Sequence, residues 1–174
     1  GDMNREEELY RIFKEELSKD SKIRYSIVDE LFNSIKDKNQ DLKRKYASEI
    51  HGLMTGNITL DIFILSFCVR IDIDVKYIKE MQEKVMLSDS LDWRQKYFIY
   101  QQIGSLIFLN PQLNEKDAVV GQWKLIEQIR DLCKTELTIE LRQVSDEECN
   151  KNLVIVMTDQ FITIQHGPTK TALD

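Results

Sequence analysis

The sequence is poor in the residues that interrupt helices. It has two prolines and six glycines among 174 residues, whereas 31% of the residues are charged and 42% are hydrophobic. Because proline and glycine are unfavourable inside helices and frequent in turns, their scarcity favours long helices over many short strands. The balance of charged and hydrophobic residues is typical of a folded chain, and this length fits one domain with its own core.

Cysteine and histidine are too few and too scattered for the usual catalytic or metal-binding clusters. The three cysteines, Cys68, Cys133 and Cys149, have no CxxC spacing, and the two histidines, His51 and His166, have no second ligand at a metal-binding spacing. The sequence therefore predicts reduced thiols, no metal site, no cofactor and no Ser-His-Asp or Cys-His arrangement. It also contains neither the GxxxxGK[ST] nor the GxGxxG nucleotide-binding pattern.

Charge and hydropathy do not indicate a nucleic-acid-binding or membrane protein. The 30 acidic and 24 basic residues leave a net charge of −6, which argues against nonspecific binding to nucleic acid. The most apolar stretch, 58–73, contains Asp61 and Arg70 and is too short for a span, which needs about 20 apolar residues. Residues 3–20 are rich in Glu, Lys and Arg and carry no apolar signal segment, so we expect a cytoplasmic protein.

Apolar residues at spacings of three and four predict a bundle of six or seven helices over residues 3–144. The expected helices cover about 4–18, 21–38, 41–55, 58–73, 75–87, 90–109 and 114–138. Residues 58–73 are apolar on every side, so we expect this helix at the centre of the bundle. Two segments alternate as strands do. For 71–75 we favour a turn, and for 137–141 a strand and a continued helix are both compatible with the sequence.

Capping residues predict several helix ends. Asp20 or Ser21 would cap the second helix, and Asp89 or Ser90 would cap the sixth. Gly56 would end the third helix in a left-handed conformation. These positions set the expected boundaries.

Several residue groups that could carry function have a simpler structural interpretation. The aromatic residues of 93–100 could stack on sugar rings, but aromatics at helical spacing are more often core residues. Asp72 and Asp74 could bind a metal or act as paired acids, and we interpret them as caps of the following helix. We expect His51 to be a partly buried, hydrogen-bonded side chain and the basic residues 43–45 to form a solvated helix face.

The C-terminal residues differ from the rest of the chain. Residues 145–151 are polar and predict a linker, whereas Leu153 to Met157 form an unbroken apolar run that is typical of a strand in a parallel sheet. Periodicity alone would also allow a buried helix. The polar loop that follows, with Pro168 where it could open a helix, favours a strand, a loop and a helix start over 152–174. The sequence thus predicts a mainly α chain, in which the helical bundle is followed by one C-terminal β-strand and the start of a helix.

A short motif follows the predicted strand: Asp-Gln-Phe at 159–161, His-Gly-Pro-Thr-Lys at 166–170, and a helix beginning Thr-Ala-Leu-Asp. With the strand, it resembles the opening of the N-terminal Rossmann-like domain in bacterial GT-B type glycosyltransferases, where a helical region precedes this strand. The resemblance implies that the full-length parent transfers a sugar from a nucleotide-sugar donor to an acceptor. Residues 152–174 would then be the beginning of a truncated Rossmann-like domain, and this chain alone would be inactive, with no catalytic residues assigned to it.

The candidate substrate-binding residues are His166, Gly167, Thr169 and Lys170. A helix N-terminus offers free N–H groups and the positive end of the helix dipole, and Gly167 lets a ligand approach the backbone. Lys170 or the threonine hydroxyl could reach a phosphate or a sugar hydroxyl. The same residues would also make an ordinary capped turn, which is the preferred interpretation without the resemblance. With it, they would lie on the floor of the cleft between the two GT-B domains.

The alternative function is a stand-alone helical protein-interaction module. In that case the C-terminal strand would pack on the bundle or pair with another copy of the chain. A homo-oligomer could form through the helices or through this strand. Neither function calls for nucleic acid or a membrane span.

Overall fold

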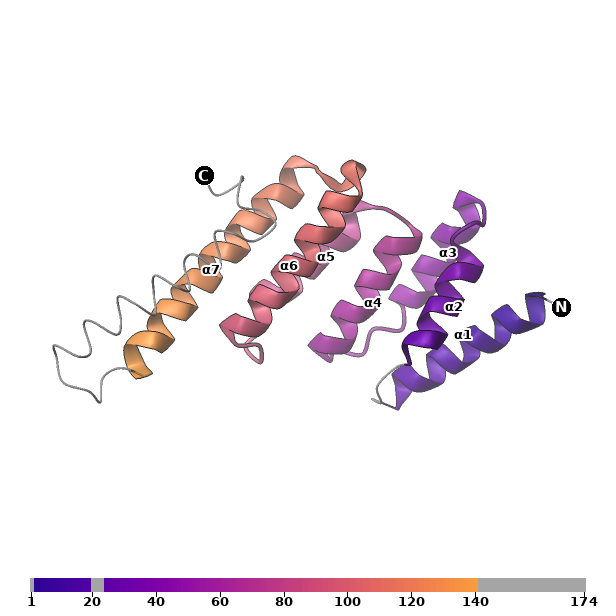
Figure 1. Cartoon of the computed structure of the whole chain (residues 1–174), viewed down its shortest axis with the longest axis horizontal. Coiled ribbons are helices and arrows are strands. Elements are labelled where there is room, and N and C mark those ends of the chain that lie inside the picture. The colour runs from indigo at the N-terminus through magenta and orange to yellow at the C-terminus, as the bar shows by residue number, and fades with distance from the viewer. Residues whose placement is uncertain (1, 20–23, 141–174) are drawn as a thin grey trace. The chain divides into compact units, whose positions relative to one another are not determined.

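The structure is a computed structural model that describes residues 2–19 and 24–140 (Figure 1). Within these ranges the chain is mainly α, as predicted, and no strand is present. The elements are α1 (Asp2–Ser18), α2 (Tyr25–Ile35), α3 (Gln40–His51), α4 (Ile58–Ile71), α5 (Val75–Leu87), α6 (Trp93–Leu109), the 3-10 helix η1 (Pro111–Leu113) and α7 (Lys116–Glu140). The predicted linker 145–151, and the predicted strand, loop and helix start in 152–174, lie outside the described residues.

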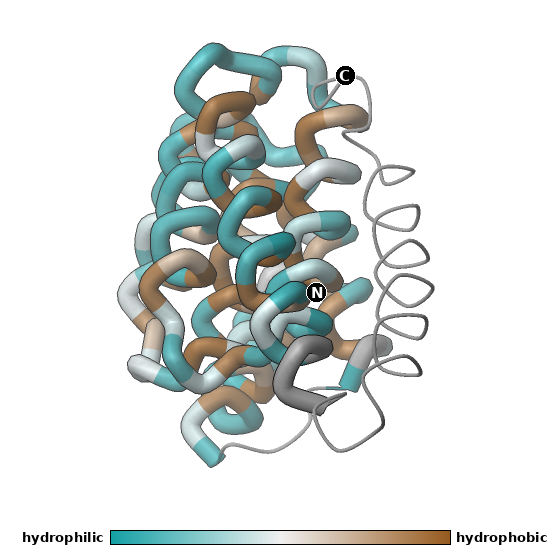
Figure 2. The backbone as a smooth tube through the Cα atoms, turned by 90° about the vertical axis from the view of Figure 1, so that its left-hand side faces the viewer, coloured by the Kyte–Doolittle hydropathy of each residue, from teal (hydrophilic) through white to brown (hydrophobic). Residues whose placement is uncertain are grey.

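The helices form because apolar side chains recur along them at helical spacing. Figure 2 shows hydrophobic residues returning at intervals along individual helices, with hydrophilic residues between them.

The chain divides into two compact units, which we call unit 1 (Gly1–Ile78) and unit 2 (Lys79–Asp174). None of the helices in the described part of the chain combines the length and hydropathy that crossing a membrane requires.

Unit 1 is built around α4. This helix packs on α3 and also contacts α2, which pairs with α1. Most of its apolar side chains are buried, so the prediction that 58–73 forms a central helix is confirmed within unit 1. Phe13 of α1 reaches the same core, where its ring centroid lies 5.3 Å from that of Phe67. Burial of these rings and of the aliphatic side chains around them stabilises this unit.

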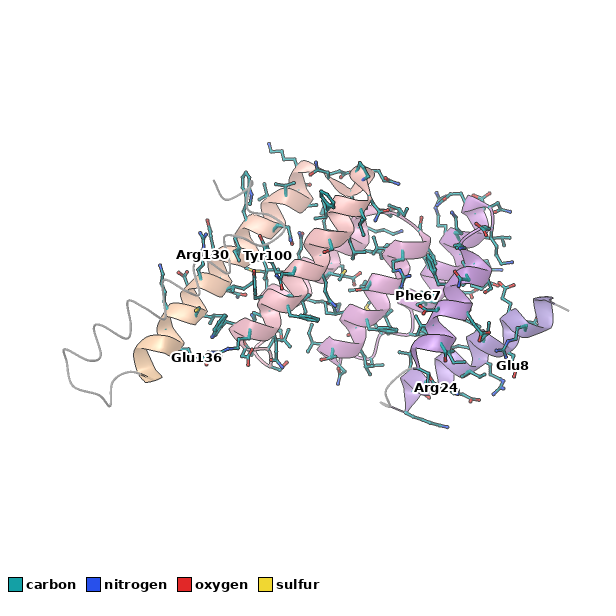
Figure 3. All side chains as sticks on the ribbon, viewed as in Figure 1. Glu8, Arg24, Phe67, Tyr100, Arg130 and Glu136 are labelled. Carbon is teal, nitrogen blue, oxygen red and sulfur yellow. The ribbon has the colours of Figure 1, made fainter. Side chains whose placement is uncertain are left out.

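Unit 2 is built around the pairing of α6 with α7. Trp93, Tyr97 and Tyr100 are buried on α6, which confirms that these aromatics are core residues. Tyr100 lies on the side of α6 that faces α7 and Arg130 (Figure 3). Burial raises the pKa of the Tyr100 hydroxyl, and the nearby Arg130 charge opposes that rise. Phe98 departs from the prediction, because 60% of its surface is exposed.

A chain of amide hydrogen bonds joins α5, α6 and α7 in unit 2. Gln82 Nε2 donates to Ala118 O at 2.8 Å and to Gln122 Oε1 at 3.0 Å. Gln122 Nε2 in turn donates to Tyr100 O at 3.1 Å. Both glutamines are buried, so these bonds satisfy groups that would otherwise be costly to bury. Gly121 allows this approach, since a Cβ atom there would overlap the Gln82 side chain.

The predicted start of the second helix at Asp20 or Ser21 is wrong. The helix begins at Tyr25, and its N-cap residue Arg24 makes no side-chain capping bond. Instead, the Arg24 backbone N–H donates to Glu16 Oε2 at 3.1 Å, and Arg24 Nε donates to Glu16 Oε1 at 2.8 Å. A side chain of α1 therefore takes over the capping role.

The predicted end of the third helix at Gly56 is also wrong. The helix ends at His51, and Gly56 lies in the following loop with a φ of +88°. The N–H groups of Thr55 and Gly56 donate to the buried Asp61 carboxylate at 2.8 and 3.0 Å. The left-handed glycine thus folds the loop back onto the first turn of α4.

The sixth helix begins two or three residues later than predicted. Asp92, rather than Asp89 or Ser90, is the N-cap, and it forms a reciprocal capping box with Gln95. Only this spacing satisfies two backbone donors at once. The predicted end of this helix at 110–111 is confirmed.

The two segments with strand-like alternation are not strands where the structure describes them. Residues 71–75 form the predicted turn, in which the Asp74 side chain accepts a 2.9 Å hydrogen bond from the Lys76 N–H at the start of α5. Asp72 does not cap α5; it is the C-cap of α4, and its Oδ1 accepts from Gln40 Nε2 at 2.9 Å. Helix α7 continues to Glu140, so the strand alternative for 137–141 is wrong over 137–140.

Candidate functional site

The predicted substrate-binding residues His166, Gly167, Thr169 and Lys170 lie outside the described residues. The candidate sites in the described ranges are therefore two grooves, the buried charged groups beside them, and one exposed helix face.

No group of three or more metal-ligating side chains is found among the described residues. His51 is half-buried at the end of α3, and its ring centroid lies 6.0 Å from that of Tyr77. This is the partly buried histidine that the sequence predicts. Cys68 and Cys133 are buried, free thiols, and Cys68 Sγ donates to Ala47 O at 3.4 Å. We interpret both cysteines as residues that pack in the core.

A groove of about 480 Å³ lies between α1 and α2 in unit 1, and we call it the α1–α2 groove. Its lining residues are Arg5, Glu6, Leu9, Glu30, Asn33, Ser34 and Lys38. Two ion pairs line it, because Arg5 lies 2.8 Å from Glu30 and Lys38 lies 3.2 Å from Glu6. The groove therefore offers paired donors and acceptors rather than an excess of one charge, which suits a neutral polar ligand better than a highly charged one.

Glu6 is the most buried charged group of this groove, with 8% of its surface exposed. Tyr46 donates its hydroxyl to Glu6 Oε1 at 2.6 Å, and the Lys38 ammonium lies 3.2 Å from Glu6 Oε2. Burial and the hydrogen bond to Glu6 raise the pKa of the Tyr46 hydroxyl far above its usual value, so it remains a donor. Both carboxylate oxygens thus have partners, and Glu6 connects α1 with α3 and with the turn that follows α2.

Lys96 is the buried charge of unit 2, with only 2% of its surface exposed. Its Nζ lies 2.9 Å from Gln128 Oε1 and 3.5 Å from Met86 O. Gln128 Nε2 donates to the same Met86 carbonyl at 2.9 Å. Met86 is in the last turn of α5, where carbonyls lack partners within the helix and a positive charge is favourable. Lys96 and Gln128 therefore cap the C-terminus of α5.

The environment of Lys96 disfavours its charged form. Burial lowers the pKa of the Lys96 ammonium, and the carboxylate of Asp89 opposes this shift.

A groove of about 420 Å³ opens beside the two partners of Lys96. Its lining residues are Met86, Lys124, Glu127, Gln128, Asp131, Leu132 and Thr135. Because the Lys96 Nζ already bonds to two acceptors and does not line this groove, we interpret it as a structural cap rather than a nucleophile.

The sequence contained a signal for both buried charges. Glu6 precedes Leu9 by three residues and so continues the apolar stripe of α1, and Lys96 lies between Trp93 and Tyr100 on the buried face of α6. A charged residue in register with an apolar stripe indicates a buried, paired group. Spacing alone does not reveal the partner, which comes from another helix in each case.

The third candidate is an exposed face of α6. Phe98, Phe108 and Leu109 have 60%, 81% and 72% of their surface exposed. Exposed apolar side chains that gather on one helix are typical of an interaction surface.

Comparisons with protein-family models, with curated proteins and with solved structures each found no match to the chain. The functional proposals below therefore rest on the residues themselves.

Proposed function

We propose that this chain is the helical N-terminal region of a glycosyltransferase that transfers a sugar from a nucleotide-sugar donor. The observation that carries the proposal is the strand, loop and helix-start motif of 152–174, with its His-Gly-Pro-Thr-Lys sequence at 166–170. The arrangement of the described residues supports it, since they are helical up to Glu140, and in the family a helical region precedes this strand.

In this proposal the helices serve the reaction without performing it. The nucleotide sugar binds where strand ends meet helix N-termini, and His166, Gly167, Thr169 and Lys170 contribute to that site. The helical residues position the acceptor or hold the enzyme in an oligomer. The α1–α2 groove supports the first role, because sugar hydroxyls both donate and accept hydrogen bonds, as its paired carboxylate and ammonium groups do.

The test is nucleotide release by the protein encoded by the whole reading frame, with a panel of UDP- and GDP-sugars. We expect turnover with one donor, and we expect His166→Ala and Lys170→Ala each to lower it by about tenfold or more, because phosphate contacts stabilise the departing nucleotide. Leu87→Glu is the matched control, since Leu87 is 73% exposed at the end of α5. Release that no donor supports would contradict the proposal.

Calorimetry on the 174-residue chain provides an independent measurement. In this proposal the donor site needs both GT-B domains, so we expect no tight binding of UDP- or GDP-sugars to these 174 residues alone. Tight binding would contradict the division of labour between the helices and the sugar-transfer domain.

A stand-alone helical interaction module is the second candidate function. The exposed apolar side chains of α6 favour it, because monomeric proteins rarely leave such residues together on one face. The reading frame discriminates the two candidates. If it encodes no alternating strands and helices after Asp174, the interaction module is the better description.

A further inference from the structure

Beyond Arg94 in the first turn, which pairs with Glu136 of α7, the exposed face of α6 carries no charge. Although 31% of the chain is charged, no charged residue occurs from Tyr97 to Asn114. Several side chains of this stretch are nevertheless exposed on α6: Phe98, Gln102, Ser105, Phe108 and Leu109. Exposed helix faces are normally rich in Lys, Glu and Arg, whereas the cores of protein interfaces are depleted in charge and enriched in aromatic residues.

Four of these residues form one continuous line. Phe98, Gln102, Ser105 and Leu109 follow one another at spacings of four, three and four, so they lie within about 60° of one another around the helix axis. We call this line the α6 seam. Its spacing is that of the contact positions in a pair of helices that pack along their length. The opposite side of α6 is already buried in unit 2.

We propose that the α6 seam pairs with the same seam of a second copy of the chain, in antiparallel orientation about a twofold axis. The order of residues along the seam is apolar, polar, polar, apolar, and it reads the same in both directions. A twofold axis midway between Gln102 and Ser105 therefore places Phe98 opposite Leu109 of the second copy, and Gln102 opposite Ser105. A twofold interface requires this self-complementarity.

The absence of charge on the seam suits a second copy of this acidic chain, and the self-complementary order of the seam favours that occupant. Two chains of net charge −6 repel one another, so they associate best through a face that brings no acidic side chains together. A strongly basic partner would instead be attracted to the acidic surfaces. The central Gln102 and Ser105 each carry a donor and an acceptor, so each can pair with the other across the axis.

The dimer should be reversible. One helix pair buries less than the roughly 800 Å² per partner of a standard interface, so we expect dissociation on dilution. Because the seam has no ion pairs and the net charges repel, added salt should strengthen the dimer, whereas salt weakens an interface built on opposite charges.

Sedimentation velocity over a wide range of protein concentrations tests the proposal. We expect a monomer–dimer equilibrium for the chain, and Phe98→Glu should raise its dissociation constant by about tenfold or more. Leu87→Glu is the control, because it adds the same charge at an exposed leucine outside α6. Circular dichroism confirms that each variant keeps its helices. A chain that is monomeric at all concentrations, or a dimer that Phe98→Glu leaves unchanged, would overturn the proposal.

Paired charges test the antiparallel register. The double variant Phe98→Lys with Leu109→Glu puts opposite charges across the seam and should dimerise more tightly than Phe98→Lys with Leu109→Lys. Equal affinities would exclude this pairing even if the chain dimerises. The inference is independent of sugar transfer, so a monomer would leave the proposed function intact, and failed nucleotide release would leave the dimer intact.

Discussion

Units 1 and 2 connect their helices through different polar groups. In unit 1 the bridging groups are charged, since Glu6 lies 3.2 Å from Lys38 and accepts the Tyr46 hydroxyl at 2.6 Å. In unit 2 two buried amides connect α5 and α7 through the 3.0 Å hydrogen bond between Gln82 and Gln122, and the charged groups nearby include Lys96, whose Nζ lies at the end of α5. Amides do not titrate and are little affected by salt, so the Gln82–Gln122 hydrogen bond should respond less to pH and salt than the Glu6–Lys38 pair.

The units also differ in the apolar surface that they leave exposed. Among the described residues, the large apolar side chains exposed in unit 1 are Leu42 and Ile73, at 41% and 38%. Those exposed in unit 2 are Leu87, Phe98, Phe108, Leu109, Trp123 and Leu132. Unit 1 thus buries its large apolar residues within itself more completely, and unit 2 keeps apolar surface available for contacts.

The largest expected effect compares one phenylalanine from each unit. Phe67 is 2% exposed and packs on Phe13, whereas Phe98 is 60% exposed. Phe67→Ala should lower the free energy of unfolding by about 3–5 kcal/mol, because it leaves a cavity. Phe98→Ala should change it by no more than about 0.5 kcal/mol. Urea unfolding at a concentration where the chain is monomeric measures both, and similar losses would contradict the assigned exposure.

Two tyrosine hydroxyls sharpen the comparison of polar groups. Tyr46→Phe removes the hydrogen bond to the Glu6 carboxylate, so it should cost about 1.5–3 kcal/mol. Tyr100→Phe should be neutral or slightly stabilising, because the buried Tyr100 hydroxyl has no hydrogen-bond partner among the described residues. Thermal or urea unfolding tests the pair. A greater loss for Tyr100→Phe would show that its hydroxyl has a partner.

Gly121→Ala tests the close approach of α5 and α7. The new methyl group would displace Gln82 from Ala118 O and Gln122, at about 1 kcal/mol for each lost hydrogen bond. Alanine has a better helix propensity than glycine and stabilises the helix by about 1 kcal/mol, so the net decrease in the free energy of unfolding should be about 1 kcal/mol. In a Gln82→Ala background the same change should stabilise the chain. A loss of equal size in both backgrounds would exclude Gln82 as the cause.

Lys96→Met should give the smallest effect, which is seen in its pH dependence. The folded-state pKa of Lys96 is below its unfolded value, so the unfolded chain binds more protons between the two values. Wild-type stability therefore gains a contribution as the pH rises through this interval towards about 10.4, the ordinary lysine pKa. Lys96→Met lacks this gain, so its stability relative to wild type should fall as the pH rises to about 10. A difference that does not change with pH would contradict the shift.

The helices could be predicted from the sequence because their apolar periodicity is local information. The central helix at 58–73 and the end of α6 at 110–111 followed from composition and from Pro111 alone. The start of α2 could not be predicted in this way, because the Arg24 backbone N–H is satisfied by Glu16 of the preceding helix. Contacts between helices decide such boundaries, and local capping patterns do not include them.

The candidate sites were predicted less well than the helices. The motif at 166–170 lies outside the described residues, and its role stays a prediction. Glu6 and Lys96 interrupt apolar stripes, but their partners Tyr46 and Gln128 come from distant segments. The charge-free run on α6 is visible in the sequence, yet only the structure shows that Phe98 faces outward. A pattern of residue types does not show which side of a helix is covered.

The absence of charge from Tyr97 to Asn114 also determines how this surface can be mapped. Trypsin cleaves after lysine and arginine, so it releases residues 97–116 as one peptide. Lysine-directed cross-linkers have no target between Lys96, which is buried, and Lys116. Carboxyl-directed labels have no target between Asp92 and Glu115. Hydroxyl-radical footprinting, which oxidises exposed aromatic rings, would detect protection of Phe98 and Phe108 that the charge-directed reagents do not report.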